Sequence, residues 1–183
     1  MKDGKILADL VENRLVVWNP AEGTELYKAG YYGKPLGIPK PKVFDFKVPL
    51  LLDLMEGLYL FEKGRLAIYE KGRRVPKREL VKRAGQIYEG FPLKYGVYKD
   101  LREKNLVVQP GIKFGCDFAV YERGPGIDHA PFLIQVKRCG DEIDAVEIVR
   151  AGRLATTVRK RFLIAVPNRK KEVTYLIFKW WKA

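Results

Sequence analysis

The stretch KFGCDFAVYERGPGIDHAPFLIQVKR, residues 113–138, contains two apolar runs separated by a loop rich in glycine and proline. The first run, residues 113–122, is rich in aromatic and β-branched residues and predicts a strand that ends near Tyr121. The second, residues 130–138, is almost continuously apolar, which is typical of a strand buried on both faces. His129, the single histidine of the chain, opens the second strand. If the two strands are neighbours, Tyr121 and His129 lie at the same end of one sheet.

The sequence on either side alternates between helical and strand patterns. Residues 92–105 have apolar side chains four positions apart and predict a helix, and residues 106–110 predict a strand. Residues 141–160 predict a helix with acids in its first turn and bases in its last, as the helix dipole favours. Residues 161–167 and 172–183 predict two more strands joined by a basic turn. The order α-β-β-β-α-β-β indicates a mixed sheet with helices packed against it.

The first half of the chain combines shorter helices and strands. Its pattern predicts a hairpin over 4–18 with its turn at Glu12–Asn13, helices over 21–30, 50–64 and 77–90, and a strand and turn over 65–76. Residues 31–49 contain four prolines and two glycines, so they predict a long irregular loop, which carries Lys34, Lys40, Lys42 and Lys47. A boundary near Gly90–Phe91–Pro92 divides the chain into domains 1–90 and 91–183.

The charge of the chain points to a polyanionic partner. Its 183 residues include 35 lysines and arginines but 22 aspartates and glutamates, a net charge of +13. Such a charge repels itself in a compact protein, and binding to nucleic acid is its commonest reason. A thermophile's ionic surface would explain the number of charges but not their imbalance.

The remaining composition excludes several protein classes. The N-terminal residues include acids and do not form a signal peptide, and no apolar stretch approaches the ~20 residues of a membrane span, so we expect a cytoplasmic protein without membrane contact. Cys116 and Cys139 are too few for a zinc site when one histidine is available. We expect free thiols, and a disulfide remains the alternative for a hyperthermophilic source.

Tyr121, His129 and Lys160 come from the ends of three predicted elements and can converge on one point. Without a carboxylate pair to hold a metal, they suit RNA cleavage by its own 2′-hydroxyl. One group takes the 2′-hydroxyl proton, another protonates the leaving 5′-oxygen, and a cation stabilises the phosphorane. Imidazole titrates near neutrality, whereas tyrosine, with an ordinary pKa near ~10, needs nearby cations such as Lys160, Arg159 and Arg161 to act as a base. The alternative is a purely structural histidine at a strand start.

Three segments resemble the C-terminal domain of archaeal tRNA-splicing endonucleases: GIKFGCDFAVYERG (111–124), HAPFLIQV (129–136) and RLATTVRKRFLIAV (153–166). GYYGKP (30–35) and residues 50–64 and 91–108 resemble the N-terminal domain of that family and the junction between its domains. The resemblance spans nearly the whole chain. It implies a small α/β N-terminal domain followed by a restriction-endonuclease-like mixed sheet flanked by helices.

The resemblance also implies roles for particular residues. Tyr121 is the expected general base, His129 the general acid and Lys160 the catalytic lysine of a tRNA-intron lyase. Such enzymes cut precursor tRNA at both exon–intron junctions of a bulge-helix-bulge fold, leave a 2′,3′-cyclic phosphate and a 5′-hydroxyl, and need no metal or cofactor. Arg153 matches the arginine that stacks on a flipped bulge base, which Trp180 or Trp181 could assist; strand packing is the alternative for the tryptophans.

Two features depart from the family pattern. Self-assembling members insert an acidic loop into a basic pocket of a partner, but the corresponding turn here, residues 167–172, carries Arg169, Lys170 and Lys171. The chain therefore reads as a catalytic subunit that pairs with a structural subunit carrying the acidic loop, in an α2β2 heterotetramer whose contacts cover the last strand. The alternative acidic contact is residues 141–144. The loop over 34–47 is long, and its Lys42 is a candidate RNA contact unless the loop is a solvated insertion.

Two other functions fit part of the pattern. Asp117 followed by Gln135 and Lys137 resembles the acid and Glu/Gln-x-Lys motif of metal-dependent restriction-type nucleases, although glutamine is a weaker magnesium ligand than glutamate. In the simpler reading Asp117 bonds nearby backbone. The other possibility is a binding subunit without activity, against which the intact Tyr-His-Lys set argues.

Overall fold

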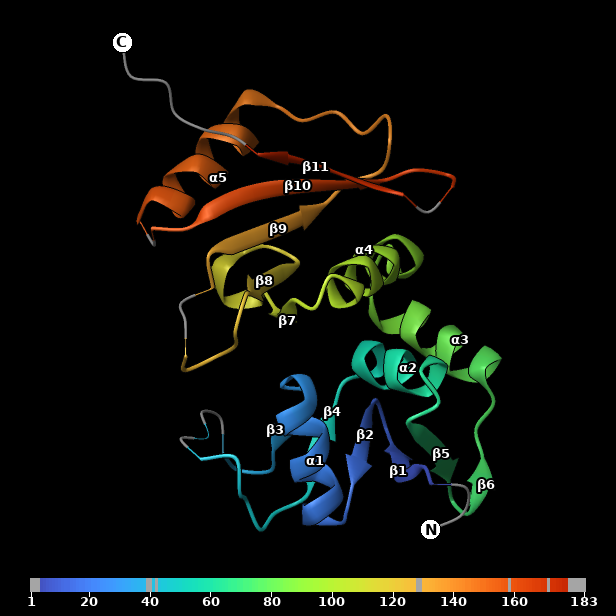
Figure 1. The fold of residues 1–183 in the computed structure, drawn as a ribbon. Helices are drawn as coiled ribbons and strands as arrows, with labels where there is room; N and C mark the ends of the chain where they lie inside the picture. The colour runs from blue at the N-terminus through green and yellow to red at the C-terminus, as the bar shows by residue number, and fades with distance from the viewer. Residues whose placement is uncertain are drawn as a thin grey trace. The chain divides into compact units, whose positions relative to one another are not determined.

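The computed structural model describes residues 4–38, 41, 43–127, 130–157, 159–170 and 172–177 (Figure 1). The chain divides into two compact units, Met1–Phe91 and Pro92–Ala183. Each unit is built on a mixed β-sheet with helices beside it, so the predicted mixed α/β class is confirmed. Among the helices of the described residues, none is long and apolar enough to cross a membrane.

The N-terminal unit contains a sheet with strand order β3-β4-β2-β1-β5-β6. The pairing of β1 with β5 is parallel and the other pairings are antiparallel. The predicted hairpin is confirmed, with Glu12 in its turn at a φ of 52°. The elements are β1 (Ile6–Val11), β2 (Arg14–Val17), α1 (Pro20–Gly30), β3 (Lys34–Pro35), β4 (Leu50–Leu52), α2 (Leu54–Glu62), β5 (Leu66–Glu70), β6 (Arg73–Arg74) and α3 (Lys77–Ile87).

The prediction of one helix over 50–64 is wrong at its start. Leu50–Leu52 forms strand β4, and the helix begins only after Asp53. Asp53 and Glu56 form a capping box, in which the Glu56 amide donates to the Asp53 carboxylate (2.8 Å) and the Asp53 amide donates to the Glu56 carboxylate (3.1 Å). The D-x-x-E spacing marks this helix start in the sequence, but the three preceding leucines extend the apolar pattern past it.

Glu56 also fixes the start of the long loop. It is buried, and its Oε1 accepts a hydrogen bond from the backbone amide of Gly33 (2.9 Å). Gly33 has a φ of +73°, and a Cβ at this position would lie 2.5 Å from the carbonyl oxygen of Leu51. A residue with a side chain is strained in this left-handed conformation, and its Cβ would also force the β4 backbone to move. This position therefore needs glycine.

We expect Gly33→Ala to lower the free energy of unfolding by at least about 2 kcal/mol, because alanine adds a backbone clash to the cost of a left-handed conformation. Gly37→Ala is the matched control, since Gly37 has a φ of +74° and no atom within 4 Å of its would-be Cβ. It should cost only the backbone strain, about 1 kcal/mol. Urea unfolding of the two variants measures the difference, and equal losses would contradict the role given to the Leu51 carbonyl.

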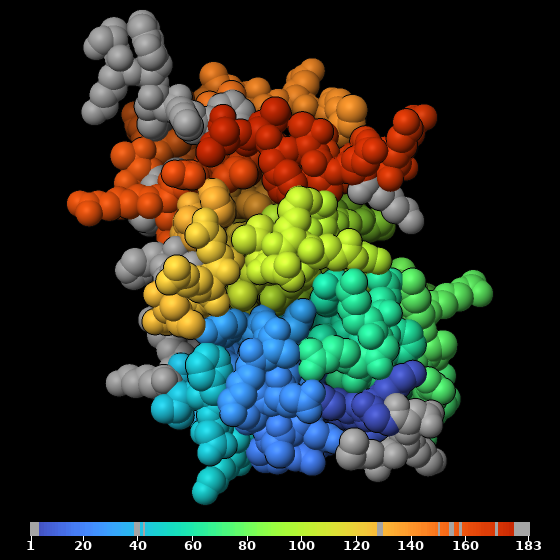
Figure 2. Space-filling model, in the orientation of Figure 1, coloured from blue at the N-terminus to red at the C-terminus, as the bar shows by residue number. Residues whose placement is uncertain are grey.

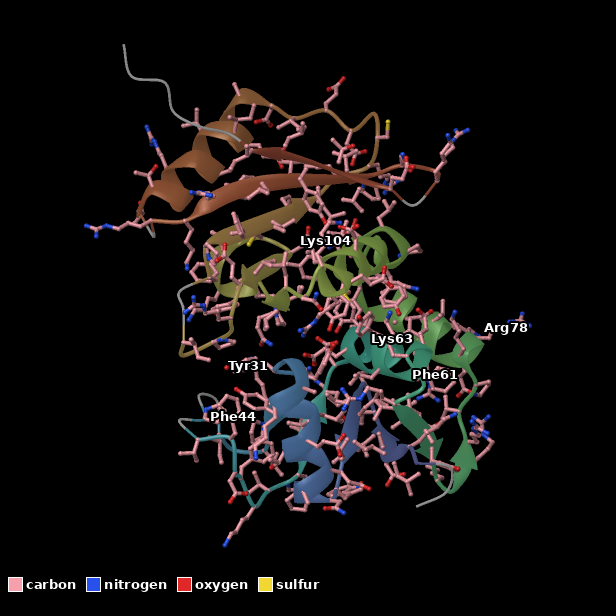
Figure 3. All side chains as sticks on the ribbon, viewed as in Figure 1. Tyr31, Phe44, Phe61, Lys63, Arg78 and Lys104 are labelled. Atoms are coloured by element: carbon pink, nitrogen blue, oxygen red, sulfur yellow. The ribbon has the colours of Figure 1, made fainter. Side chains whose placement is uncertain are left out.

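Aromatic contacts hold both arms of the 31–49 loop to α1. Tyr31 ends α1 and packs against Phe44, with ring centroids 5.6 Å apart (Figure 3). Phe46 packs edge-on against Tyr27 of α1 at 5.7 Å. The Leu36 amide donates to the Pro49 carbonyl (2.8 Å), which ties the two arms of the loop together. The loop is therefore anchored at its base, as expected of a compact surface loop rather than a linker.

The C-terminal unit contains a sheet with strand order β11-β10-β9-β8-β7. β9 and β10 are parallel, and the other pairings are antiparallel. This matches the predicted α-β-β-β-α-β-β order, and β9 is the buried strand that the apolar run predicted. The elements are α4 (Phe91–Glu103), β7 (Val107–Pro110), the 3₁₀ turn η1 (Ile112–Phe114), β8 (Phe118–Tyr121), β9 (Phe132–Val136), α5 (Ala145–Thr157), β10 (Arg161–Pro167) and β11 (Val173–Ile177).

The alternation of side chains assigns the two helices of this unit to opposite faces of the sheet. One face includes Phe118, whose ring packs against Tyr98 of α4 (6.2 Å), and Tyr175, whose hydroxyl donates to Asp100 of α4 (2.6 Å). The other face carries a core of Ala119, Leu133, Phe162 and Ile164, which packs against Ala151 of α5. Residues paired in one register row point to the same face of a sheet, and successive residues of a strand point to opposite faces. The two sets of residues therefore lie on opposite faces.

Three predicted boundaries in this unit are corrected. The strand expected over 113–122 begins at Phe118, because residues 112–114 form a 3₁₀ turn that Gly115 ends at a φ of 67°. The helix expected over 141–160 spans 145–157, and Asp144 caps it by accepting from the Glu147 amide (2.6 Å). Of the strand expected over 172–183, residues 173–177 form β11, and 178–183 lie outside the described residues.

Candidate active site

Three strand ends of the C-terminal sheet meet at one edge. β8 runs antiparallel to β9, and β9 runs parallel to β10, so the end of β8 lies beside the starts of the other two strands. Val120, Phe132 and Arg161 form one register row across the three strands. Tyr121 and Lys160 are each one residue beyond this row, toward the same edge. The predicted neighbourhood of the strands on either side of the 122–129 loop is thus confirmed.

Tyr121 lies at the edge on the same face of the sheet as α5. It is the last residue of β8, pairs with Val107 of β7, and is half-buried. Its side chain packs against the core that includes Leu133 and Phe162. Strand pairing on both sides fixes the backbone of β8, so the phenol extends from a rigid element rather than from the loop that follows it.

Lys160 reaches from the start of β10 across to the start of β9. Its ammonium donates a hydrogen bond to the carbonyl oxygen of Ala130 (2.6 Å). The residue before it, Arg159, is left-handed at a φ of 53°, and its amide donates to Thr156 of α5 (3.1 Å). This turn ends the helix and directs the next residue into the strand. The positive charge of Lys160 is therefore held beside the residue that follows His129 in the sequence.

The loop between β7 and β8 places the aromatic ring of Phe114 at the same edge. A Cβ on Gly111 would lie 2.6 Å from the Cys116 sulfur and 2.7 Å from its carbonyl oxygen, so the tight return of the loop needs glycine here. Phe114 packs against the core of the sheet. The Lys160 ammonium lies 5.5 Å from the centre of its ring, and the Lys113 ammonium lies 5.6 Å from it. Two cations thus share one ring at the edge, within the distance of cation–π attraction.

Sequence reasoning missed Lys113 and Phe114 because it assigned them to a strand. The signal that could have found them is the pair of glycines, Gly111 and Gly115, which flank residues 112–114 and indicate a turn. A lysine at the tip of such a turn is exposed, as Lys113 is. The edge therefore combines a phenol, two ammonium groups and an aromatic ring, a set that attracts a phosphate and can support proton transfer.

Comparison with known proteins identifies the family of the chain that carries this edge. Residues 91–175 match the family described as tRNA intron endonuclease, catalytic C-terminal domain. Residues 6–81 match its N-terminal domain. The chain belongs to the tRNA intron endonuclease family. This membership indicates that the chain acts as an endoribonuclease in tRNA splicing.

Archaeal relatives of this family align with the chain over nearly its full length. A tRNA-splicing endonuclease of Hyperthermus butylicus is 50% identical over 179 residues, which are 97% of this chain and 99% of the relative. Proteins of the same name from Sulfurisphaera tokodaii and Saccharolobus islandicus are each 40% identical, again over 97% of this chain and 99% of the relative.

The structure describes three of the candidate site residues predicted from the sequence. Tyr121 and Lys160 share the edge, and Arg153 is exposed on α5, seven residues before Lys160. His129, Trp180 and Lys42 lie outside the described residues. The backbone on the C-terminal side of His129 is described, and the Ala130 carbonyl that Lys160 contacts belongs to it.

The residues of the rival metal site hold the fold together instead. Asp117 accepts hydrogen bonds from the Gln135 side-chain amide and the Val136 backbone amide (2.8 Å each), and pairs with the Lys94 ammonium (2.8 Å). Lys137 pairs with Glu147 of α5 (2.8 Å). Because N–H donors engage both oxygens of Asp117, the carboxylate anchors α4 to β9. Within the described ranges, no three histidine, cysteine or acidic side chains gather as potential metal ligands.

Both cysteines are free thiols, so the disulfide alternative is not formed. Cys116 is a buried residue of the β7–β8 loop, and burial raises the pKa of its thiol to about 11. Cys139 is exposed beyond the end of β9. The start of β9 carries the candidate site, so the exposed thiol lies at the opposite end of that strand.

Proposed function

We propose that this chain is the catalytic subunit of a tRNA-splicing endonuclease that cuts precursor tRNA at bulge-helix-bulge exon–intron junctions. The observation that supports it best is the shared edge, where Tyr121 ends β8 and Lys160 reaches the carbonyl next to His129. In this proposal residues 1–90 are the N-terminal domain of the enzyme and residues 91–183 its catalytic domain, acting in the cytoplasm.

The reaction we assign to this edge is attack of the ribose 2′-oxygen on the adjacent phosphorus. Tyr121 takes the 2′-hydroxyl proton as general base, and a bond forms between the 2′-oxygen and phosphorus. His129 gives a proton to the 5′-oxygen as its bond to phosphorus breaks. Lys160 stabilises the negative charge of the phosphorane between these steps. The products are a 2′,3′-cyclic phosphate and a 5′-hydroxyl, and no metal takes part in the chemistry.

The RNA around the scissile phosphate needs further contacts. We assign Arg153 to stacking on a flipped bulge base, because an exposed guanidinium on α5 is free to lie flat against a base. Trp180 would assist the stacking, and Lys42 would contact RNA from the 34–47 loop. The anchoring of that loop by Phe44 and Phe46 supports a functional loop over a solvated insertion.

The partner in this proposal is a structural subunit that carries an acidic loop. The β10–β11 turn of this chain presents exposed Arg169 and Lys170, a charge that a basic pocket repels. The alternative acidic contact, residues 141–144, is partly used within the chain, because Asp141 accepts from the Arg138 amide (2.8 Å) and Asp144 caps α5. β11 is the outer strand of its sheet and exposes Leu176 and Ile177, which supports strand pairing with a second subunit.

Cleavage of a bulge-helix-bulge RNA in excess chelator tests the proposal. We expect no cleavage by the pure chain, and cleavage at both junctions once a structural subunit with an acidic loop is added. End analysis of the fragments should find cyclic phosphate and 5′-hydroxyl termini. Cleavage by the lone chain would refute the heteromeric assembly, and dependence on added magnesium would refute the metal-free chemistry.

A further inference from the structure

The positive charge of the N-terminal unit is concentrated in one short segment. Residues 1–91 contain 17 basic and 12 acidic residues. Residues 71–83 alone contain seven basic residues and one acidic residue, so the rest of the unit has ten basic and eleven acidic residues. A thermophile surface rich in ion pairs would have similar numbers of basic and acidic residues in residues 71–83 and in the rest of the unit. The excess of basic over acidic residues in this unit therefore comes from residues 71–83, the β6–α3 segment.

Ion pairs neutralise part of this segment. Arg83 binds Glu70 through both guanidinium nitrogens (2.9 and 2.6 Å) and also contacts Glu79 (3.0 Å). Arg73 binds Glu79 (2.9 Å), and the hydrogen bond from Arg73 is the main reason that the pKa of Glu79 is lowered. Lys77 pairs with Glu62 of α2 (2.7 Å). These contacts hold the β5–β6 hairpin, α3 and α2 together.

Four exposed cations remain outside this network: Lys71, Arg74, Arg78 and Lys82. Within the part of the chain that the structure describes, none of them forms an ion pair. We call these four residues the basic face. Part of this segment, green in Figure 2, projects from the surface of the unit, and Figure 3 shows Arg78 extending away from α3.

The backbone presents the basic face on well-defined elements. Lys71 and Gly72 form the two-residue loop of the β5–β6 hairpin, both with positive φ (49° and 80°), as a type I′ turn requires. Arg74 pairs with Tyr69 in the same hairpin. Arg78 and Lys82 are four residues apart on α3, so they share a helix face, whereas Leu80 and Ala84 are buried on the opposite one.

We infer that the basic face binds the phosphate backbone of double-helical RNA, outside the bulges that are cut. Phosphate contacts need positive charge at fixed spacing but no base-reading or stacking groups. Residues 71–83 contain no aromatic side chain, which disfavours a protein interface, whose centre is typically enriched in such anchors. The inference rests on the proposed function, which makes precursor tRNA the polyanion that this chain meets, and it adds a binding role for the N-terminal unit.

A charge-matched pair of double variants tests the inference. Arg78→Gln with Lys82→Gln removes one arginine and one lysine of the basic face. Arg14→Gln with Lys28→Gln removes the same charges from exposed positions elsewhere in the unit. Fluorescence anisotropy of a full-length precursor tRNA bound to the complete chain measures the dissociation constant between 50 and about 300 mM salt.

We expect the basic-face variant to bind at least about tenfold more weakly at 100 mM salt, and the slope of log Kd against log salt to fall by about 1.4–1.8, the value for two lost phosphate contacts. The control variant should change neither quantity appreciably. Equal losses in both variants, which would indicate net charge alone, or unchanged binding by the basic-face variant, would overturn the inference.

A cleavage assay on the same proteins, with the structural subunit added, separates this inference from the proposed function. The basic-face variant should cleave a minimal bulge-helix-bulge RNA at the unaltered rate when RNA is saturating. If the unaltered assembly fails to cleave while the binding loss is observed, the proposed function fails and the RNA-binding surface stands. Unfolding midpoints within about 1 °C of the unaltered chain confirm that the substituted side chains are not structural.

Discussion

Replacing His129 with alanine is expected to slow cleavage of a bulge-helix-bulge RNA by about 10²–10⁴-fold, the usual contribution of a positioned general acid. The dissociation constant for RNA should stay within about threefold of the unaltered value, because the imidazole is assigned to proton transfer rather than to binding. Single-turnover rates in the assembled enzyme measure the first quantity, and anisotropy measures the second.

The leaving group makes this prediction specific to a general acid. An RNA with sulfur in place of the bridging 5′-oxygen has a leaving group that needs no proton, so it should restore most of the rate of His129→Ala. A variant that stays slow on the sulfur substrate would assign His129 to structure or to binding instead.

Replacing Lys160 with alanine is expected to lower the cleavage rate by about 10²–10³-fold, the cost of one lost charge-stabilising donor at a transition state. Its ammonium is fixed by the Ala130 carbonyl (2.6 Å) and lies over the Phe114 ring, so the cation is already in place before substrate binds. Lys160→Arg should recover part of the rate, because it keeps the charge but changes its position.

Arg161→Ala is the matched control for this position. Arg161 is the next residue, is exposed, and places its guanidinium 5.9 Å from the ring of Phe132 on the other face of the sheet. We expect its rate to fall less than about fivefold, as for a surface cation that contributes only to the general field. If the two alanine variants lost activity equally while both remained folded by circular dichroism, the preference for Lys160 would be wrong.

Local patterns were sufficient to predict most elements of the fold. The continuous apolar run over 130–138 predicted the central strand β9, and the β-rich residues on either side of Glu12–Asn13 predicted the hairpin of β1 and β2. The errors lie where one apolar run spans two structures. Leu50–Leu52 forms β4 and Leu54 begins α2, so a single polar residue, Asp53, interrupts the run, and its capping box with Glu56 marks the helix start.

The candidate site could be anticipated only in part. The convergence of Tyr121 and Lys160 was expected from sequence, because both residues end or begin predicted elements of one mixed sheet. The contact of Lys160 with the Ala130 carbonyl and the Phe114 ring could not be foreseen, since the predicted strand over 113–122 included Phe114. Long-range contacts of this kind depend on how a glycine-flanked turn folds back, which period-two patterns do not report.

The two thiols differ enough to make this chain easy to label at one place. The raised pKa and the burial of Cys116 keep it protonated and shielded near neutral pH, where maleimide reagents consume thiolates. Cys139 remains as the accessible point of attachment, with the length of β9 between it and the edge that Lys160 occupies. A fluorophore placed there without any mutation would report on subunit association and RNA capture in real time, away from the reacting phosphate.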